Sequence, residues 1–127
     1  MTIQTHLDEL RDALAGCRIA AFGDLSSGLI LRSSTTKPVA RETLDQLCED
    51  ATWCFKHFEN SLGSGSTDVT NYGQAAIKFT TLETQVFVRH PTDPTDVTCA
   101  AIEPSQDIEE ALMTVRLAAF ELGSSAQ

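Results

Sequence analysis

The sequence predicts a single α/β domain in which a helix, two strands, a second helix, three strands and a last helix follow one another. Its 127 residues suit one domain, because a chain of this length buries roughly two-thirds of its unfolded surface. Three segments place apolar residues at helical spacing, and five short apolar runs are bounded by turn-forming residues. We therefore treat residues 1–127 as one domain.

The first helix is predicted at the start of the chain. Its apolar residues recur at helical spacing, with charged residues between them: Ile3, Leu7, Leu10 and Leu14. Gly16 then acts as a C-terminal stop. Two apolar runs follow at Ile19–Phe22 and Leu29–Leu31, and a turn-forming cluster at 23–28 separates them. This pattern predicts a β-hairpin.

The second helix is predicted from Val39 to about Leu62, with Pro38 in its first turn. Its core stripe comprises Ala40, Leu44, Leu47, Cys48, Ala51, Phe55, Phe58 and Leu62. On the opposite face lies the only tryptophan, Trp53, accompanied by Val39, Gln46, Asp50 and His57. A large exposed aromatic side chain is typical of a protein interface, although it can also cover a nearby loop. We favour the interface.

Residues 61–71 are rich in Gly, Ser and Thr and predict a flexible connection that is too short to separate two domains. Three strands follow, at Gln74–Thr80, Thr84–His90 and Asp96–Ile102. Residues 81–83 form a tight connection between the first two of them, and 91–95 form a longer turn with two prolines.

The last helix is predicted to open at Pro104 and Ser105, with Ser105 as N-cap, and to close at Gly123, which leaves a frayed tail at 123–127. Its core stripe comprises Ile108, Ala111, Leu112, Val115, Ala119 and Leu122. A second apolar strip on the far side comprises Met113, Leu117 and Phe120. Packing against the first helix explains part of this strip, and a binding partner explains the remainder.

The charge and the apolar pattern exclude several classes of protein. Nine Lys and Arg against eighteen Asp and Glu give a net charge of −9, which disfavours binding to nucleic acid or to an anionic membrane. No apolar run is long enough to span a bilayer. The first ten residues lack the features of a secretion signal, so we expect a cytoplasmic protein.

The sequence offers no constellation of residues for catalysis, metal binding or cofactor binding. No two of His6, His57 and His90 have the spacing of metal ligands. The four cysteines form no Cys-x-x-Cys pair and are expected to be reduced, and Cys99 lies in an apolar strand, where the pKa of a thiol rises. We therefore expect neither an enzyme nor a bound metal or cofactor.

The order of elements, together with three segments, resembles the roadblock/dynein-light-chain family, in its bacterial type. These segments are LDELRDAL, the hairpin IAAFGDLSSGLILRSS and the long helix after Pro38. The chain departs from the family at residues 15–18, where a Gly-Val-x-Gly entry is usual, and in its longer loop at 61–71. The resemblance implies an α/β sandwich with a five-stranded antiparallel sheet in the order 2-1-5-4-3. The second helix covers one face, and the other two helices cover the opposite face.

The resemblance also implies a homodimer formed through the second helix and the third strand, which joins two sheets into one of ten strands. The matching positions are Gln46, Asp50, Trp53, His57, Ala75, Ala76, Ile77 and Lys78. Members of the family are non-catalytic dynein light chains or partners and regulators of Ras-like GTPases. We therefore expect a homodimeric adaptor or regulator of a small GTPase, or of a motor or scaffold partner, with Met113, Leu117 and Phe120 as further partner-binding residues.

Two other classes of protein remain as alternatives. One is an acidic, dimeric secretion chaperone that binds a segment of an effector, although such chaperones place three strands before their middle helix. The other is a small-molecule sensor of the PAS or profilin-like type, which needs a lined cavity that an aromatic content of 6% hardly supplies.

Overall fold

The computed structural model describes residues 2–62, 75–90, 93–104 and 107–126. The predicted order of elements is confirmed. The helices and strands, in chain order, are α1 (Ile3–Ala13), β1 (Cys17–Asp24), β2 (Leu29–Thr35), α2 (Arg41–Leu62), β3 (Ala75–Phe79), β4 (Thr84–Arg89), β5 (Asp96–Ile102) and α3 (Ile108–Ala126). Most of the predicted 61–71 connection lies outside the described residues.

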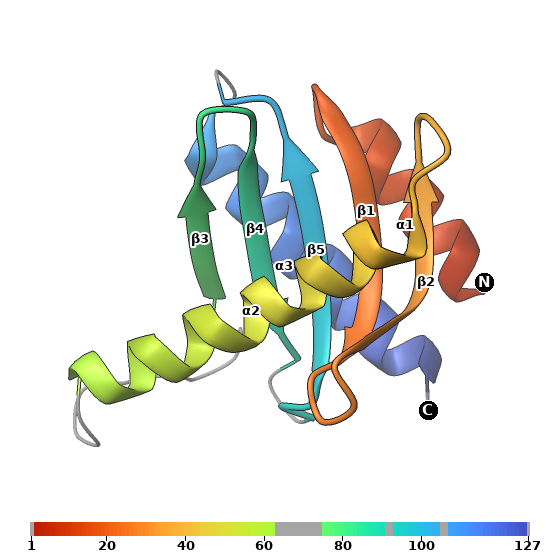
Figure 1. The fold of residues 1–127 in the computed structure, drawn as a ribbon. Coiled ribbons are helices and arrows are strands. Elements are labelled where there is room, and N and C mark those ends of the chain that lie inside the picture. The colour runs from red at the N-terminus through yellow and green to blue at the C-terminus, as the bar shows by residue number, and fades with distance from the viewer. Residues whose placement is uncertain (1, 63–74, 91–92, 105–106, 127) are drawn as a thin grey trace.

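The five strands form one antiparallel sheet in the order β2-β1-β5-β4-β3, as Figure 1 shows. This order confirms the expectation drawn from the family resemblance. The pairing of β1 with β5 places Ala20 opposite Ala100 in the middle of the sheet, and β2 and β3 are its two edges.

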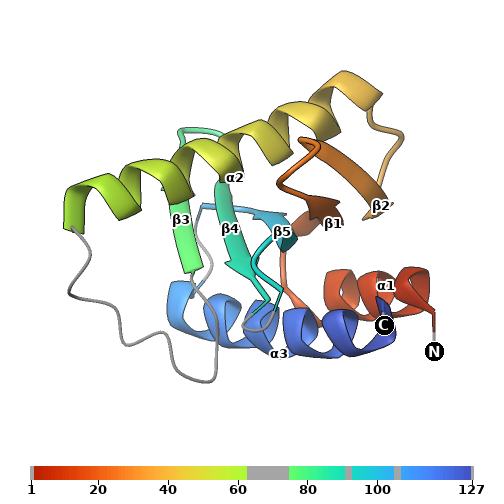
Figure 2. The ribbon, with the colours of Figure 1, turned by 90° about the horizontal axis from the view of Figure 1, so that it is seen from below.

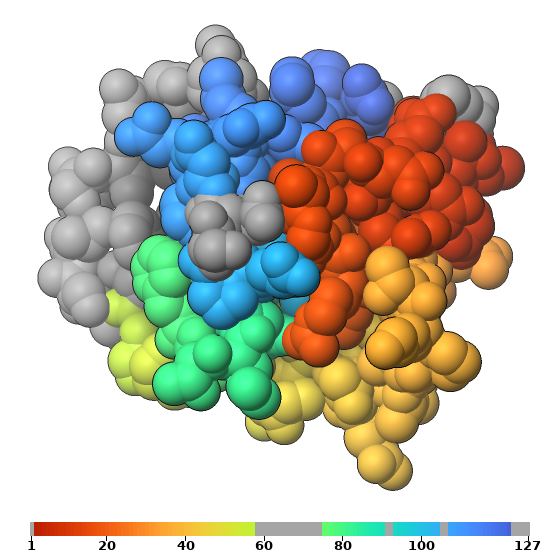
Figure 3. Space-filling model, turned by 90° about the horizontal axis from the view of Figure 1, so that it is seen from above, coloured from red at the N-terminus to blue at the C-terminus, as the bar shows by residue number. Residues whose placement is uncertain are grey.

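Helices cover both faces of the sheet. Figure 2 shows α2 on one face and α1 beside α3 on the other, and Figure 3 shows the surfaces of α1 and α3 adjoining each other. Alternate residues of each strand point to opposite faces, so two cores form. One core packs α1 and α3 around Leu7, Val88 and Val115, and the other packs α2 around Phe55, Phe87 and Cys99.

Side-chain hydrogen bonds cap α1 and connect it to the edge strand β2. The Thr2 hydroxyl accepts a hydrogen bond from the Thr5 N–H and caps the helix. Arg11 Nε donates to Ser34 Oγ over 2.8 Å, and Ser34 Oγ donates to Asp8 Oδ1 over 2.6 Å. The bonds from Ser34 and Gln4 lower the pKa of Asp8 below its usual value.

The β1–β2 hairpin needs glycine at two positions for different reasons. Gly28 has a φ of +73°, in the left-handed region that glycine adopts without strain. At Gly23 the requirement is space. A Cβ there would lie 2.9 Å from Ile30 Cδ1, 3.0 Å from the Leu29 carbonyl oxygen and 3.4 Å from Cys48 Sγ.

The start of α2 differs from its prediction. The helix begins at Arg41, and Pro38 precedes it, outside the helix, instead of lying in its first turn. The carbonyl oxygen of Ala40 accepts the first hydrogen bonds, from the N–H groups of Thr43 and Leu44. Ala40 is therefore exposed and does not belong to the core stripe. The buried stripe comprises Leu44, Leu47, Cys48, Ala51 and Phe55, whereas the side chains of Phe58 and Leu62 lie outside those described.

Both predicted ends of α3 are wrong. The cap is Asp107, whose carboxylate accepts hydrogen bonds from the N–H groups of Glu109 and Glu110. The predicted cap, Ser105, lies outside the described residues. Gly123 does not end the helix, which continues to Ala126. The fully buried Leu122 explains the continuation, because its packing holds the last turns against the sheet.

Within the described part of the chain, no helix is sufficiently long and apolar to cross a membrane.

Candidate protein interface

Four of the predicted interface residues lie on one side of α2. Gln46, Asp50, Trp53 and His57 follow one another at helical spacing and form a single stripe beside the core stripe. Trp53 is 58% exposed, and its ring stacks on that of His57 with 3.8 Å between the ring centroids. Gln46 Nε2 donates to Asp50 Oδ1 over 3.1 Å. The stripe is therefore an ordered surface with a large aromatic side chain at its centre.

The edge strand β3 lies beside this stripe. Within the described residues it pairs only with β4, so its other edge presents unpaired backbone groups. Ala76 packs toward α2, and Ala75 packs toward the core under α3, as strand alternation requires. Lys78 Nζ lies 3.4 Å from Asp50 Oδ1 and joins the strand to the helix.

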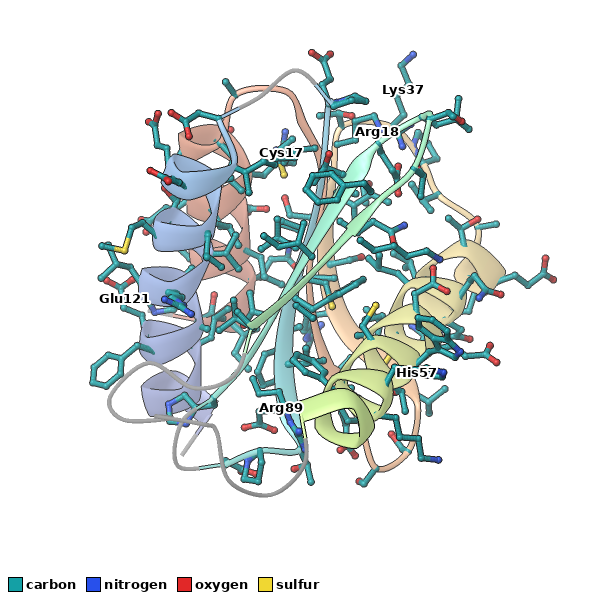
Figure 4. The ribbon with its side chains drawn as sticks, turned by 90° about the vertical axis from the view of Figure 1, so that its left-hand side faces the viewer. Cys17, Arg18, Lys37, His57, Arg89 and Glu121 are labelled. Carbon is teal, nitrogen blue, oxygen red and sulfur yellow. The ribbon has the colours of Figure 1, made fainter. Side chains whose placement is uncertain are left out.

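We call this combined feature the α2–β3 surface, and it comprises Gln46, Asp50, Trp53, His57, Ala75, Ala76, Ile77 and Lys78. The structure therefore places Ala76 and Lys78 beside the α2 residues, whereas Ala75 and Ile77 lie on the opposite face of the strand. Figure 1 shows that the C-terminal part of α2 extends past β3, beyond the edge of its own sheet. Figure 4 views that edge and shows His57 and Glu121 on opposite sides of the sheet.

A groove adjoins the α2–β3 surface, with a volume of about 530 Å³. Gln46 and Asp50 of α2 form one wall, Arg18 and Gln85 come from the sheet, and Glu83 comes from the connection between β3 and β4. Arg18 and Glu83 form an ion pair, and Gln85 Nε2 donates to Glu83 Oε2 over 2.7 Å. Gln85 Oε1 is buried and has no hydrogen-bond partner among the described residues.

Sequence reasoning missed Arg18, Glu83 and Gln85 as residues of this groove. One signal was available, because Gln85 is a polar residue directly before the apolar run Val86–Val88, on the side of the strand that faces α2. Arg18 gave no such signal. It lies in a β-bulge, between Cys17 and Ile19, that only the pairing with β5 reveals.

The second predicted surface is also exposed. On the outer side of α3, Met113, Leu117 and Phe120 are 58%, 64% and 57% exposed. The helix α1 packs alongside α3, but it leaves these three side chains uncovered. Packing between the two helices therefore does not explain the strip.

The cysteines have the chemistry of buried thiols. Burial raises the pKa of Cys17 to about 11, and burial together with Asp24 raises the pKa of Cys48 to about 11. The fully buried Cys99 also has a raised pKa. Among the described residues, no group of three or more His, Cys, Asp or Glu side chains is arranged to hold a metal ion.

The fold is similar to that of several solved structures. A Roadblock/LC7 domain from Streptomyces avermitilis has a TM-score of 0.75 and 8% identity, and the match covers 99% of this chain and 98% of that one. MglC from Myxococcus xanthus has a TM-score of 0.69 and 11% identity, with 98% of each chain covered. An MglB structure with a tetrameric arrangement has a TM-score of 0.74 and 16% identity, with 98% and 87% covered.

No protein-family model matches the sequence, and no curated protein matches it. At identities of 8 to 16% the structural similarity concerns the fold alone.

Proposed function

We propose, starting from the roadblock fold that this chain has, that the protein is a non-catalytic homodimeric adaptor or regulator. Its partner in this proposal is a small Ras-like GTPase or, as a broader class, a motor or scaffold protein. The observation that carries the proposal is the α2–β3 surface, where an exposed tryptophan adjoins a strand edge that no described residue pairs with. The partner class comes from the family resemblance of the sequence.

In the proposed dimer, the β3 strands of two copies pair antiparallel around a two-fold axis. Such an interface is self-complementary, so each copy contributes the same residues. Because α2 extends beyond β3, its C-terminal part then lies over the partner's sheet, next to the partner's groove. This arrangement covers Trp53 and also removes the exposed strand edge. Self-assembly of a related fold supports the proposal, since MglB was solved with a tetrameric arrangement.

The negative charge of the chain suits a partner with a basic patch. At a net charge of −9, complementary charge raises the association rate and the specificity more than the affinity itself. The secretion-chaperone alternative expects three strands before the middle helix, and this chain has two, β1 and β2.

The dimer is tested by light scattering on Trp53→Arg. We expect the wild type to have the mass of a dimer and Trp53→Arg the mass of a monomer, because a buried unpaired charge is costly. Met113→Arg is the matched control, since Met113 is also 58% exposed but lies on α3. A dimeric Trp53→Arg variant contradicts the assignment of the interface.

The partner class is tested by affinity capture from native extract, with a GTP analogue or GDP present, read by mass spectrometry. Recovery of a Ras-like GTPase that depends on the nucleotide supports the proposal. Recovery of one secreted effector, independent of nucleotide, overturns it in favour of the chaperone.

A further inference from the structure

The outer side of α3 carries an apolar strip that the dimer does not use. We define the α3 strip as Met113, Leu117 and Phe120, which are spaced by four and three positions and therefore share one helix face. Each is more than half exposed, and the Phe120 ring also stacks against His90 with centroids 6.2 Å apart. Aligned apolar side chains of this size are typical of a protein-binding surface.

Carboxylates lie at both ends of the strip. Glu109 and Glu110 precede Met113 by one helical turn, and Glu121 follows Leu117 by one turn. All three are exposed. In the layer formed by α1 and α3, six carboxylates accompany two guanidinium groups. Arg11 and Asp8 are both bonded to Ser34, and Glu121 lies 3.5 Å from His6 Nδ1. The strip is therefore an apolar surface within an acidic one.

The position of the strip separates it from the α2–β3 surface. The helices α2 and α3 cover opposite faces of the sheet, as Figure 2 shows. Pairing of two copies through α2 and β3 leaves α3 on the outer face of each copy. A partner can therefore bind the α3 strip whether or not the protein is dimeric.

A second copy of this chain is a poor occupant of the strip. In a two-fold contact between two α3 helices packed antiparallel, Glu109 and Glu110 of one copy approach Glu121 of the other. Like charges brought together in an interface repel each other, so the acidic ends oppose self-pairing. The same carboxylates favour a partner that carries cations.

We propose that the α3 strip binds an amphipathic helix of another protein, with apolar residues at helical spacing and Lys or Arg at its flanks. The apolar face of such a helix covers Met113 and Leu117, and its cations meet the carboxylates at both ends. This is a second interface, independent of the proposed dimer and of its GTPase partner.

The test uses a synthetic, fluorescein-labelled amphipathic peptide of leucine and lysine and measures its binding by fluorescence anisotropy. We expect Leu117→Ser to weaken binding by about tenfold or more, the loss typical of a central interface residue. Leu82→Ser is the matched control, because Leu82 is 81% exposed in the connection between β3 and β4. It should bind the peptide like the wild type.

A scrambled peptide of the same composition, whose leucines share no helix face, separates specific docking from general attraction to an acidic protein. We expect it to bind more weakly than the amphipathic peptide. Equal binding of the two peptides, or equal loss in Leu117→Ser and Leu82→Ser, overturns the proposal. Trp53→Arg should retain peptide binding, so a failure of the proposed dimer does not imitate a failure of this second interface.

Discussion

Substitution of Gly23 by alanine is expected to destabilise the protein because atoms of β2 leave no space for a Cβ at this position. The added Cβ would lie 2.9 Å from Ile30 Cδ1 and 3.0 Å from the Leu29 carbonyl oxygen. Overpacking of this kind costs about 1 to 3 kcal/mol. The loss of glycine's freedom in the unfolded chain opposes it by about 0.4 to 1 kcal/mol. We expect a net loss of about 1 kcal/mol in the free energy of unfolding.

A second substitution identifies the atom responsible. Ile30→Val removes Cδ1, the nearest atom to the new Cβ, and by itself costs about 0.5 to 1.5 kcal/mol. In the double variant the clash with Cδ1 is absent. The loss of unfolding free energy measured for the double variant should therefore be smaller than the sum of the losses of the two single variants. The Leu29 carbonyl oxygen stays in place, so the rescue is incomplete.

Urea unfolding at one fixed protein concentration measures these free energies, since association changes apparent stability. Gly28→Ala is the control, because its cost comes from a φ of +73° with no atom within 4 Å of the new Cβ. The loss of unfolding free energy caused by Gly28→Ala should simply add to the loss caused by Ile30→Val. Two outcomes would refute the steric reasoning. One is a Gly23→Ala variant as stable as the wild type, and the other is a double variant whose loss of unfolding free energy equals the sum of the losses of Gly23→Ala and Ile30→Val.

Three further predictions concern charge, capping and thiol reactivity. Burial and the neighbouring Asp93 raise the pKa of Asp96, so this carboxyl binds a proton more readily in the folded state than in the unfolded state. The protein therefore loses stability as the pH rises from the unfolded pKa to the folded pKa of Asp96. Asp96→Asn should therefore raise the Tm at neutral pH, and the gain should disappear in acid; an unchanged Tm at neutral pH would contradict this cause. Asp107→Ala should lower the free energy of unfolding by about 0.5 to 2 kcal/mol through loss of the α3 cap, while Asp107→Asn retains an acceptor and most of the stability. With a thiol reagent, the half-buried Cys54 should react in the folded protein and Cys99 only upon unfolding, as mass spectrometry of the labelled peptides can check.

The order of elements was predictable because apolar residues recur at helical or strand spacing in most of the elements. Residues such as Leu7, Phe87 and Val115 occupy the buried positions that the pattern assigns to them. The ends of the helices were harder to predict. A proline such as Pro38 suits the segment before a helix as well as the first turn of the helix, and the sequence contains no signal that separates the two. At the end of α3, the burial of Leu122 outweighs the usual tendency of a glycine to stop a helix.

The candidate interface was predictable in part. The helical spacing of Gln46, Asp50 and Trp53 sufficed to place them on one stripe, and the family resemblance connected that stripe with the third strand. The ion pair between Lys78 and Asp50 and the groove beside it depend on how α2 crosses the sheet. A crossing angle is set by packing between elements far apart in the sequence, so local patterns do not contain it.

The middle of the sheet cannot form until late in the synthesis of this protein. The strand β1 leaves the ribosome early and pairs with β2 as a local hairpin, but its other edge waits for β5. Ala20 meets Ala100, which is eighty positions later in the chain. Contacts of such long range form slowly, and a strand edge that stays open is prone to pair with other chains. The open edge of β1 is therefore a site at which the nascent protein can aggregate in the interval before residues 96–102 emerge.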